Sequence, residues 1–409
     1  MAIQQKPSLL MIALEVPPCR SAGVQRTLKF AEYLVQKGWR PIILTVESDI
    51  YKNTDAEPYQ WPEGVEVVRT KALDSSKAFS IKGKYFAWSA IPDKWWTWLF
   101  SAIPAGKRLI QQHNPALIWS TYPVSTAHFI AWRLSKASGL PWVADYRDPL
   151  QVRYDPAVER YSTIAKWIER KVMLNATRVV CTADKSKQLY QSIYPQLPDN
   201  KYEVIQNGFD EGNFNQLTTR DPSVNHGKFV FLYSGALYPR GRDPVPLFKA
   251  IQALKKSGVV CSEQVEFRFR GAGDGAGYQT VMQQLDVADC VRFMPPVSYQ
   301  ESLQEMLNSD ALLLIQGELF NNQIPGKLYE YIRVGQPILA LTPEQSATAQ
   351  VVQDSQRGLV AENAEGLEQA ISAILAGFDV PDLNAFDYSR EQRADELDQL
   401  FTGIIKGTH

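Results

Sequence analysis

Three features of the sequence predict an α/β protein built from two doubly wound, Rossmann-like domains. The chain has 409 residues, which is too long for one compact core, so two domains of similar size are expected. Short apolar runs, typical of buried parallel strands, alternate with segments of helical periodicity, and this alternation occurs twice. A polar stretch with little periodicity, residues 207–228, separates the two series.

The first series begins with a strand–helix–strand unit. Leu9–Leu14 is a continuous apolar run of the kind found in buried parallel strands. In Val24–Gln36 the apolar residues recur at helical spacing, and Gly38 ends that helix before a second strand at Pro41–Val46. Further strands are expected at Val65–Arg69, Ala116–Thr121, Trp142–Asp145 and Arg178–Thr182, and further helices at Thr126–Ser138 and Val158–Leu174. Strands and helices that alternate at these lengths predict a parallel sheet covered on both faces.

The second series predicts another sheet of the same kind. Its strands are expected at Phe229–Ser234, Val265–Arg270, Val291–Met294, Ala311–Ile315, Pro337–Leu341 and Gly358–Ala361. A helix is predicted at Lys327–Val334, and a last amphipathic helix at about Ser389–Ile404.

The expected domain boundaries follow from these two series. The first domain is predicted at residues 1–206, the linker at 207–228 and the second domain at 229–385. The C-terminal helix, 386–409, is expected to pack back on the first domain. Doubly wound domains bind ligands at the carboxyl ends of their strands, so two such domains facing each other would form a central cleft with one ligand per domain.

The composition narrows the class of function. The net charge of −1 provides no general attraction for nucleic acid. The sequence contains four histidines, which argues against a histidine-rich metal centre, and four scattered cysteines without a CxxC pair, which indicate reduced thiols in the cytoplasm. We find no signal peptide and no apolar run near the ~18 residues of a membrane span. We therefore expect a cytoplasmic protein, attached at most to the inner face of the cell membrane.

The most informative segment is residues 321–331. Pro325 suits the start of a helix because it has no amide hydrogen to leave unpaired. The free amides and positive dipole of a helix start favour a diphosphate, and Lys327 adds a cation there. Glu330 lies one turn later on the same face, where its carboxylate can accept hydrogen bonds from two ribose hydroxyls. A solvated Lys–Glu pair is the alternative interpretation, but the strand–loop–helix setting favours a binding site.

Six short motifs occur in order over nearly the whole chain. They are Ser21-Ala22-Gly23, Ser120-Thr121-Tyr122-Pro123, Asp145-Tyr146-Arg147-Asp148-Pro149, Ile205-Gln206-Asn207-Gly208-Phe209-Asp210, Tyr233-Ser234-Gly235-Ala236-Leu237 and Pro325-Gly326-Lys327-Leu328-Tyr329-Glu330-Tyr331. Each motif is weak alone, but their joint order and spacing make the sequence resemble a GT-B glycosyltransferase of the retaining family-four type. The resemblance implies a GT-B fold with an acceptor-binding N-terminal domain and a nucleotide-sugar-binding C-terminal domain.

The resemblance also implies roles for the segment around Lys327. In that family the second glutamate of an E-x7-E motif holds the nucleotide ribose, and Glu330 matches it. The first glutamate, near the sugar, falls at Asn322, whose amide can hydrogen-bond hydroxyls but carries no charge. This departure indicates a variant branch. The resulting assignment gives the donor sugar Asn322, Gln323, Ile324 and Pro325, and gives the nucleotide and its diphosphate Lys327, Leu328 and Glu330.

A second phosphate element is expected after the strand Phe229–Ser234. Gly235 lets the backbone come close to a ligand, and family members place a basic residue nearby on the donor diphosphate. We assign that role first to Arg242 and next to Arg240, since a guanidinium can bind two phosphate oxygens; a solvated basic turn is the alternative. Tyr299 follows the strand where family members seat the base, and it could stack on the base or pack in the core.

In the N-terminal half, the resemblance implies catalytic roles for Arg147, Asp148 and Asp145. Arg147 could contact the donor phosphate or sugar, and either aspartate could orient the acceptor hydroxyl. A buried Asp–Arg pair that holds two loops together is an equally good interpretation. Gly23 opens the first helix and allows close approach of an anionic ligand. His128 lies among apolar residues and is expected to be a satisfied helix histidine.

The function that the resemblance implies is sugar transfer to a hydroxyl acceptor, with retention, in surface polysaccharide or glycolipid synthesis. The donor would be a UDP- or GDP-linked sugar and the acceptor a saccharide or a lipid-linked molecule. No DxD spacing is convincing, so we expect no metal and no other cofactor. The alternatives are a nucleotide-sugar epimerase or hydrolase of the same fold, and a non-catalytic nucleotide-sugar-binding partner.

Tryptophans and lysines alternate in residues 82–107. They are Trp88, Trp95, Trp96 and Trp98, with Lys82, Lys84, Lys94 and Lys107. Such a pattern could mark a membrane-interface patch or a site for a lipid-linked acceptor. Core aromatics with solvated lysines are the alternative, which we favour slightly.

Overall fold

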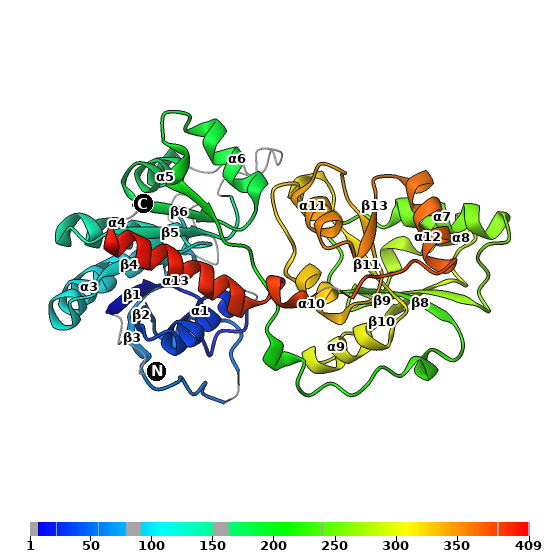
Figure 1. Ribbon diagram of the computed structural model, residues 1–409, viewed down its shortest axis with the longest axis horizontal. Coiled ribbons are helices and arrows are strands. Elements are labelled where there is room, and N and C mark those ends of the chain that lie inside the picture. The colour runs from blue at the N-terminus through cyan, green and yellow to red at the C-terminus, as the bar shows by residue number, and fades with distance from the viewer. Residues whose placement is uncertain are drawn as a thin grey trace. The chain divides into compact units, whose positions relative to one another are not determined.

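The computed structural model (Figure 1) divides the chain into two compact units, which are described separately. The structure describes residues 7–21, 23–55, 57–78, 91–149, 163–238, 240–382 and 384–407. One unit comprises Met1–Gln206 together with Arg390–His409, and the other comprises Asn207–Ser389.

The N-terminal unit is built on a seven-stranded parallel sheet. The strand order is β3-β2-β1-β4-β5-β6-β7, and all neighbouring strands are parallel. The strands are β1 (Ser8–Ile12), β2 (Arg40–Val46), β3 (Glu66–Thr70), β4 (Leu117–Thr121), β5 (Trp142–Tyr146), β6 (Arg178–Cys181) and β7 (Tyr202–Val204). The strands β4, β5 and β6 are buried along their whole length because helices cover both faces of the sheet.

The helices of this unit cover the two faces of its sheet. They are α1 (Val24–Gln36), α2 (Ser75–Ala78), α3 (Leu99–His113), α4 (Ser125–Ser138), α5 (Thr163–Asn175), α6 (Asp184–Ile193) and α13 (Arg390–Lys406). Apolar side chains of α3, α4 and α5 belong to one core cluster, and those of α1 and α13 belong to the other. Helix α4 packs between α3 and α5, so these three helices form one continuous layer (Figure 1).

The C-terminal helix α13 packs on α1. Leu397, Leu400 and Phe401 are buried in one core cluster. The same cluster contains the side chains on one face of β1 and β4, such as Leu9 and Leu117. Each such side chain contributes about 1.5–3 kcal/mol when it is fully buried. The indole of Trp39 adds a hydrogen bond of 2.7 Å to the Asp398 carboxylate.

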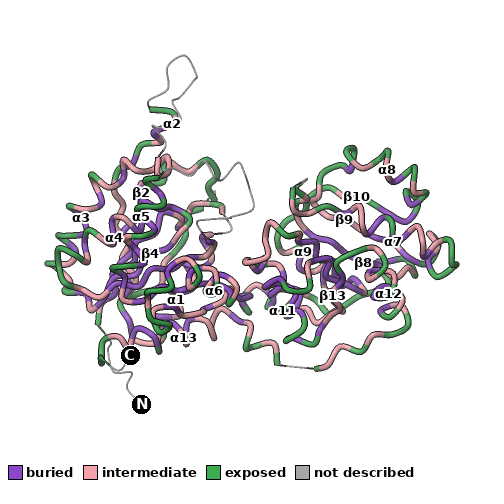
Figure 2. The backbone as a smooth tube through the Cα atoms, turned by 90° about the horizontal axis from the view of Figure 1, so that it is seen from above, coloured by how far each residue is buried: buried purple, intermediate pink, exposed green. Residues whose placement is uncertain are grey.

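The second unit contains a six-stranded parallel sheet in the order β10-β9-β8-β11-β12-β13. Its strands are β8 (Phe229–Ser234), β9 (Val265–Arg270), β10 (Val291–Met294), β11 (Ala311–Ile315), β12 (Ile338–Leu341) and β13 (Gly358–Ala361). Its helices are α7 (Val245–Lys256), α8 (Gln279–Gln284), α9 (Tyr299–Asn308), α10 (Gly326–Val334), α11 (Ala347–Asp354) and α12 (Ala364–Leu375). Figure 2 shows the buried backbone of β8 inside this unit, whereas the edge strand β13 is mostly half-buried.

The predicted fold class, two doubly wound parallel sheets, is confirmed, and the predicted strands agree with the structure to within one or two residues. The short edge strand β7 has no separate apolar run in the sequence and escaped prediction. Helix α3, which contains Pro104 in its interior, was not predicted, and neither were α2, α6, α7, α8, α9, α11 and α12. The predicted helix Val158–Leu174 begins at Thr163 in the described part of the chain.

Candidate functional site

The start of α10 meets the end of β8 in the second unit. Pro325 is the N-cap of α10, and no side chain caps the first amides of this helix. Gly335 ends the helix in the left-handed conformation, with φ of 83°. The prediction placed Pro325 one position later, at the first helical residue. The uncapped amides and the positive end of the helix dipole together form an anion-binding surface.

The ammonium group of Lys327 lies across the end of β8. Its Nζ donates a hydrogen bond of 2.5 Å to the carbonyl of Ser234 and lies 4.0 Å from the centre of the Tyr233 ring. Gly235 has a φ of 118°, and a Cβ at this position would lie 3.0 Å from Nζ. A side chain is therefore excluded at Gly235 both by the backbone conformation and by the lysine. The sequence prediction that Gly235 and Lys327 belong to one site is consistent with this contact.

Arg242 is the second cation at this place. Its guanidinium lies 4.9 Å from the Tyr238 ring and 5.5 Å from the Phe320 ring. Its Nη1 donates a weak hydrogen bond of 3.4 Å to the Ala236 carbonyl, and its buried Nε has no hydrogen-bond partner. Among the described residues no carboxylate forms an ion pair with Arg242 or with Lys327. Arg240 is exposed.

The electrostatics of Lys327 reflect this shortage of negative charge. Burial lowers the pKa of Lys327 to about 7, the neighbouring Arg242 lowers it further, and only Glu330 acts in the opposite direction. Burial also raises the pKa of the Tyr233 phenol to about 12, so that ring stays neutral beside the two cations. Two cations held together without a carboxylate partner form a site that an anion would stabilise.

Glu330 and Tyr299, predicted separately to contact the nucleotide, lie in direct contact. The Tyr299 hydroxyl donates a hydrogen bond of 2.7 Å to Oε1 of Glu330 and accepts one of 3.3 Å from Asn213 Nδ2. Tyr299 is 48% exposed and therefore does not pack in the core. Its phenol orients the Glu330 carboxylate one turn after Lys327, a contact between α9 and α10 that the sequence did not predict.

The loop before α10 is held mainly through its backbone. The Gln323 carbonyl accepts hydrogen bonds from Gln316 Nε2 at 3.2 Å and from Thr348 Oγ1 at 3.1 Å. Ile324 is buried, and Leu328 is completely buried. The side chains of Ile324 and Leu328 therefore belong to the core, and any contact that these residues make with a ligand would be through the backbone. Asn322 is partly exposed.

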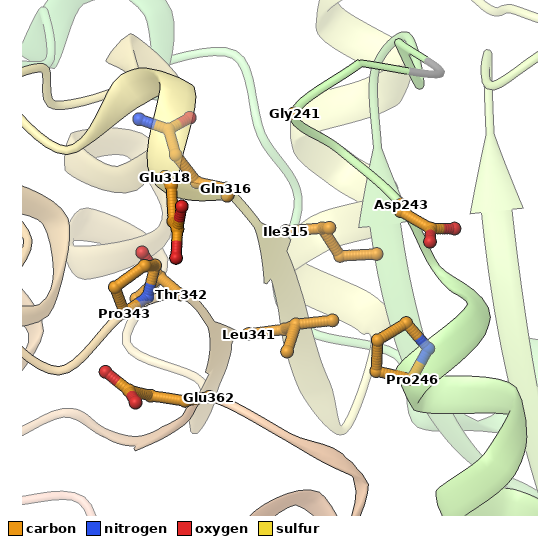
Figure 3. Close-up of a pocket in the computed structure, with 11 residues that line it drawn as sticks. Gly241, Asp243, Pro246, Ile315, Gln316, Glu318, Leu341, Thr342, Pro343 and Glu362 are labelled. Atoms are coloured by element: carbon orange, nitrogen blue, oxygen red, sulfur yellow. The ribbon is translucent and has the colours of Figure 1, made fainter. Parts of the chain in front are cut away.

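A pocket of about 300 Å³ opens at the carboxyl ends of β11 and β12. Figure 3 shows its lining, which includes the carboxylates of Asp243, Glu318 and Glu362 around the apolar Ile315 and Leu341. The pocket touches Gly241 and Asp243, the two neighbours of Arg242, but none of the predicted site residues lines it.

In the N-terminal unit Asp145 has a structural role. Its carboxylate is completely buried and accepts hydrogen bonds from Arg26 Nη2 at 2.6 Å, from Arg26 Nε at 3.0 Å and from Thr121 Oγ1 at 2.7 Å. Arg26 also donates to the carbonyls of Ile205 and Gln206, each at 2.9 Å. The pair ties α1 to β5 and to the segment after β7. We therefore withdraw the catalytic assignment of Asp145 in favour of the alternative, a buried Asp–Arg pair, whose arginine is Arg26.

Arg147 pairs with a carboxylate that the sequence did not single out. Its Nη2 donates to Glu15 Oε2 at 2.7 Å, and its Nε donates to the Tyr122 carbonyl. Burial raises the pKa of the neighbouring Asp148, and Arg147 acts in the opposite direction. These side chains gather at the carboxyl ends of β1, β4 and β5, where a doubly wound sheet binds ligands. Glu15 follows the buried run Leu9–Leu14, and this position was the signal that could have identified it.

Gly23 makes room for this ion pair. A Cβ at Gly23 would overlap the guanidinium of Arg147 and the carboxylate of Glu15. The φ of Gly23 is −74°, so the glycine is required by space and not by the backbone conformation. Ala22 lies outside the described residues.

Replacing Gly23 with alanine is expected to displace Arg147 and, if Arg147 acts in catalysis, to lower the turnover rate ~10-fold, because small misplacements of reacting groups slow a reaction strongly. The free energy of unfolding should change by less than ~1 kcal/mol, since the displaced groups are the ends of flexible side chains. Gly277→Ala is the matched control, since a Cβ there meets nothing within 4 Å. Steady-state kinetics and thermal unfolding measure both effects. An unchanged rate in Gly23→Ala would contradict a catalytic role for Arg147.

His128 is a buried core histidine, but the prediction that its ring is fully hydrogen-bonded is only half right, because its buried Nε2 has no hydrogen-bond partner in the described part of the chain. Its Nδ1 lies 2.8 Å from the Ser120 hydroxyl, and its ring packs 4.6 Å from the Tyr146 ring. Burial lowers the pKa of His128 to about 3, so the imidazole stays neutral at physiological pH.

The tryptophans of residues 82–107 that the structure describes pack mostly inside the protein. Trp98 is completely buried and donates a hydrogen bond of 2.9 Å to Thr70 Oγ1. Trp95 packs against the core beneath Lys94, whose Nζ lies 4.5 Å from its ring. Trp96 is partly buried. Core aromatics, the alternative that we favoured, therefore describe this segment; Trp88, Lys82 and Lys84 lie outside the described residues.

The described ranges of the chain contain no group of three or more His, Cys, Asp and Glu side chains suited to a metal ion. No helix in those ranges is long and apolar enough to cross a membrane.

Comparisons with known proteins place the chain. Residues 22–208 match the family model described as a glycosyl transferase 4-like domain. Searching the curated proteins gave no match.

Solved structures match along almost the whole chain. Sucrose-phosphate synthase from Thermosynechococcus elongatus aligns with a TM-score of 0.66 and 15% identity over 98% of this chain and 100% of that chain. HepE from Anabaena in complex with UDP-glucose aligns with a TM-score of 0.61 and 12% identity over 97% of this chain and 99% of that chain. WaaG, a glycosyltransferase involved in lipopolysaccharide biosynthesis, aligns with a TM-score of 0.57 and 13% identity over 98% of each chain.

These matches confirm the GT-B fold that the sequence motifs indicated, and they agree with the resemblance to glycosyltransferases. Two separate kinds of comparison agree, since the sequence model covers the N-terminal unit and the structural matches cover both units. The chain therefore has the GT-B fold of these glycosyltransferase structures, and its residues 22–208 match a glycosyl transferase 4-like domain.

Proposed function

We propose that this chain transfers a sugar from a nucleoside diphosphate sugar to a hydroxyl acceptor, with retention of configuration. The observation that carries the proposal is the pair of cations Lys327 and Arg242 beside the uncapped start of α10. Neither cation forms an ion pair among the described residues, and Glu330 lies one turn further along the helix. This arrangement supplies a diphosphate site and, one helical turn away, a carboxylate that can accept hydrogen bonds from a ribose.

The chemical role of these residues follows from the charge of the leaving group. A departing nucleoside diphosphate develops negative charge, which Lys327, Arg242 and the α10 amides are placed to stabilise. In the proposed reaction the leaving oxygen takes the proton of the acceptor hydroxyl, which attacks the anomeric carbon on the same face. The enzyme then needs no metal and no covalent intermediate.

Asn322 is the residue on which the distinction between a catalytic and a merely donor-binding protein depends. Its amide can hydrogen-bond the hydroxyls of the donor sugar but cannot stabilise a positive charge as a glutamate would. If the sugar site depended on that charge, the chain would be a non-catalytic nucleotide-sugar-binding partner. An epimerase or hydrolase of the same fold would also bind the donor and would release a free or altered sugar.

The proposed donor is a UDP- or GDP-linked sugar. HepE, which shares the fold, was solved with UDP-glucose, and this favours the uridine donor as the first to be tested. The proposed acceptor is a saccharide or lipid-linked molecule of surface polysaccharide or glycolipid synthesis. We place the enzyme at the cytoplasmic surface of the membrane, where such an acceptor would be available.

The test is incubation of the purified protein with UDP- and GDP-sugars, with and without an acceptor mixture. Release of nucleoside diphosphate that depends on acceptor, together with a new glycoside of retained configuration by NMR, supports the transferase. Free sugar would indicate a hydrolase, an epimerised donor would indicate an epimerase, and binding without turnover would indicate a binding partner. No release and no binding with any donor would overturn the proposal. Activity that survives EDTA supports the absence of a metal requirement.

A further inference from the structure

The outer surface of the α3–α4–α5 layer has a charge very different from that of the whole chain. The chain carries nearly equal numbers of basic and acidic residues. The three helices contain one acidic residue, Glu169, which is completely buried. They contain seven basic residues, Lys107, Arg108, Arg133, Lys136, Lys166, Arg170 and Lys171. Because α4 packs against both neighbours, these charges belong to one surface of the N-terminal unit.

The seven cations are available to a partner. Six of them are exposed, and Lys171 is partly buried. Among the described residues none of the seven forms an ion pair with a carboxylate. The surface therefore has positive charge that nothing in the described structure compensates, although the net charge of the chain is −1.

A stripe of exposed apolar side chains runs along α5 between these charges. Ile164 is 49% exposed, Trp167 is 45% exposed and Leu174 is 44% exposed. Their spacing of three and seven residues puts them on the same side of the helix, with Lys171 between them. An exposed stripe of this kind on one helix, surrounded by lysine and arginine, is typical of a helix that lies at a membrane surface.

Aromatic rings support this stripe from below. The Trp167 ring lies 5.6 Å from the Trp132 ring and 6.2 Å from the Phe129 ring, both on α4. The Lys171 ammonium lies 5.5 Å from the Trp167 ring and 5.9 Å from the Trp132 ring. The exposed indole is thus fixed by its neighbours, so little conformational entropy is lost when it enters another phase. Tryptophan prefers the boundary between lipid headgroups and chains.

We propose that this basic aromatic face, the outer surface of α3, α4 and α5, docks on a bilayer that contains anionic lipids. The basic residues attract the anionic headgroups, and Trp167, Ile164 and Leu174 enter the interface between them. A second copy of the chain is a poor occupant, because a symmetric contact would bring two uncompensated positive surfaces together. A free polyanion would use the charges but leave the apolar stripe without a role.

This inference deepens the proposed membrane location and differs from the tryptophan segment that the sequence suggested. It rests on that location but not on the donor site, which lies in the other unit. The helices begin at the carboxyl-end edge of the parallel strands, the edge that also carries Arg147 and Glu15. A bilayer against this face would therefore border an edge of the N-terminal unit, the unit to which the resemblance assigns acceptor binding.

Flotation of the full-length protein with lipid vesicles tests the proposal. The wild-type protein is expected to float with vesicles of phosphatidylcholine mixed with phosphatidylglycerol, and to be released by high salt. With phosphatidylcholine alone, binding should be at least ~10-fold weaker. The double variant Lys166→Glu/Arg170→Glu should bind the anionic vesicles ~10²-fold more weakly, and Trp167→Ser/Leu174→Ser at least ~10-fold more weakly.

Matched variants of the second unit serve as controls. Lys249→Glu/Lys256→Glu reverses two exposed charges on α7, and Val259→Ser replaces an apolar residue that is 43% exposed. Both should float like the wild type. Thermal unfolding checks that every variant is folded, and release of nucleoside diphosphate with a water-soluble acceptor should be unchanged in all of them. If the wild-type protein released no nucleoside diphosphate at all, the proposed function would be contradicted, but the vesicle-binding result would still stand.

Three results would overturn the docking proposal. One is a wild-type protein that does not float with anionic vesicles. Another is a result in which the charge variant binds vesicles more weakly, the Trp167/Leu174 variant binds like the wild type, and the wild type also binds heparin tightly. The partner would then be a soluble polyanion. The third is flotation that neither variant weakens, which would place the membrane contact on a different surface.

Discussion

Replacing Lys327 with methionine is expected to lower kcat/KM for the nucleotide-sugar by ~10²–10³-fold, the loss that follows removal of one preorganised charge-stabilising donor. The ammonium group lies at the end of β8 and the start of α10, 2.5 Å from the Ser234 carbonyl. Methionine fills similar space beside the Tyr233 ring but cannot compensate the charge of a departing diphosphate. Arg242 remains in the variant, so weak donor binding should persist.

The thermal stability of Lys327→Met distinguishes a role of Lys327 in donor binding from a structural role. Burial lowers the pKa of Lys327 to about 7, below the value of about 10.4 for an unfolded lysine. Between these values the unfolded state binds the extra proton, so the contribution of Lys327 to folding becomes more favourable as the pH rises. At neutral and lower pH the folded state must hold this cation against desolvation and Arg242. Lys327→Met should therefore unfold at the same temperature as the wild type or higher, and a lower temperature would indicate a structural lysine.

The same lysine predicts a pH dependence of donor binding. A bound diphosphate restores the charged form of Lys327, so the pKa of Lys327 rises on binding. Above about pH 7 the binding reaction must then take up a proton, and the affinity for UDP should fall by up to ~10-fold per pH unit. Titration calorimetry in buffers of different ionisation enthalpy measures this uptake. Lys327→Met should show no such uptake, and a wild-type affinity that is constant from about pH 6 to about pH 9 would contradict the mechanism.

Replacing Glu330 with glutamine is expected to lower donor affinity by ~10²-fold. A carboxylate that accepts hydrogen bonds from two ribose hydroxyls contributes about 1.5–3 kcal/mol for each bond, and the neutral amide retains only part of this. The wild-type protein should therefore bind a 2′-deoxyribose donor much more weakly than the ribose donor. Glu330→Gln should discriminate little between the two. Equal discrimination in both proteins would show that Glu330 does not hold the ribose.

Tyr299→Phe is the matched variant for this experiment. It removes the 2.7 Å hydrogen bond to Glu330 and keeps the aromatic ring. If Tyr299 acts by orienting the carboxylate, its effect on affinity should be smaller, ~5-fold, and should vanish in the Glu330→Gln background. If Tyr299 stacks on the base instead, as the sequence suggested, Tyr299→Phe should change little, and Tyr299→Ala should weaken binding in both backgrounds.

The sequence by itself determined the layers of the protein and the local part of the donor site. The apolar runs at β1, β8 and β11 are typical of strands that a parallel sheet buries on both faces, and their short lengths and alternation with helices favour strands over buried helices. Lys327 and Glu330 lie three residues apart on one helix, and helical geometry alone puts them on the same face. Pro325 and Gly335 delimit that helix through backbone conformation. All of these signals act over a few residues, so they can be read along the chain.

The tertiary structure decided which distant side chains meet. Arg147 pairs with Glu15, 132 positions away in the sequence, and Asp145 pairs with Arg26, 119 positions away. No local sequence pattern identifies these partners of the two candidate catalytic residues. Tyr299 meets Glu330 because α9 and α10 pack together. The uncompensated charge of the α3–α5 layer likewise arises because three separate helices lie side by side. Pairing of this kind depends on how the layers stack, and the order of residues along the chain does not encode it in any local pattern.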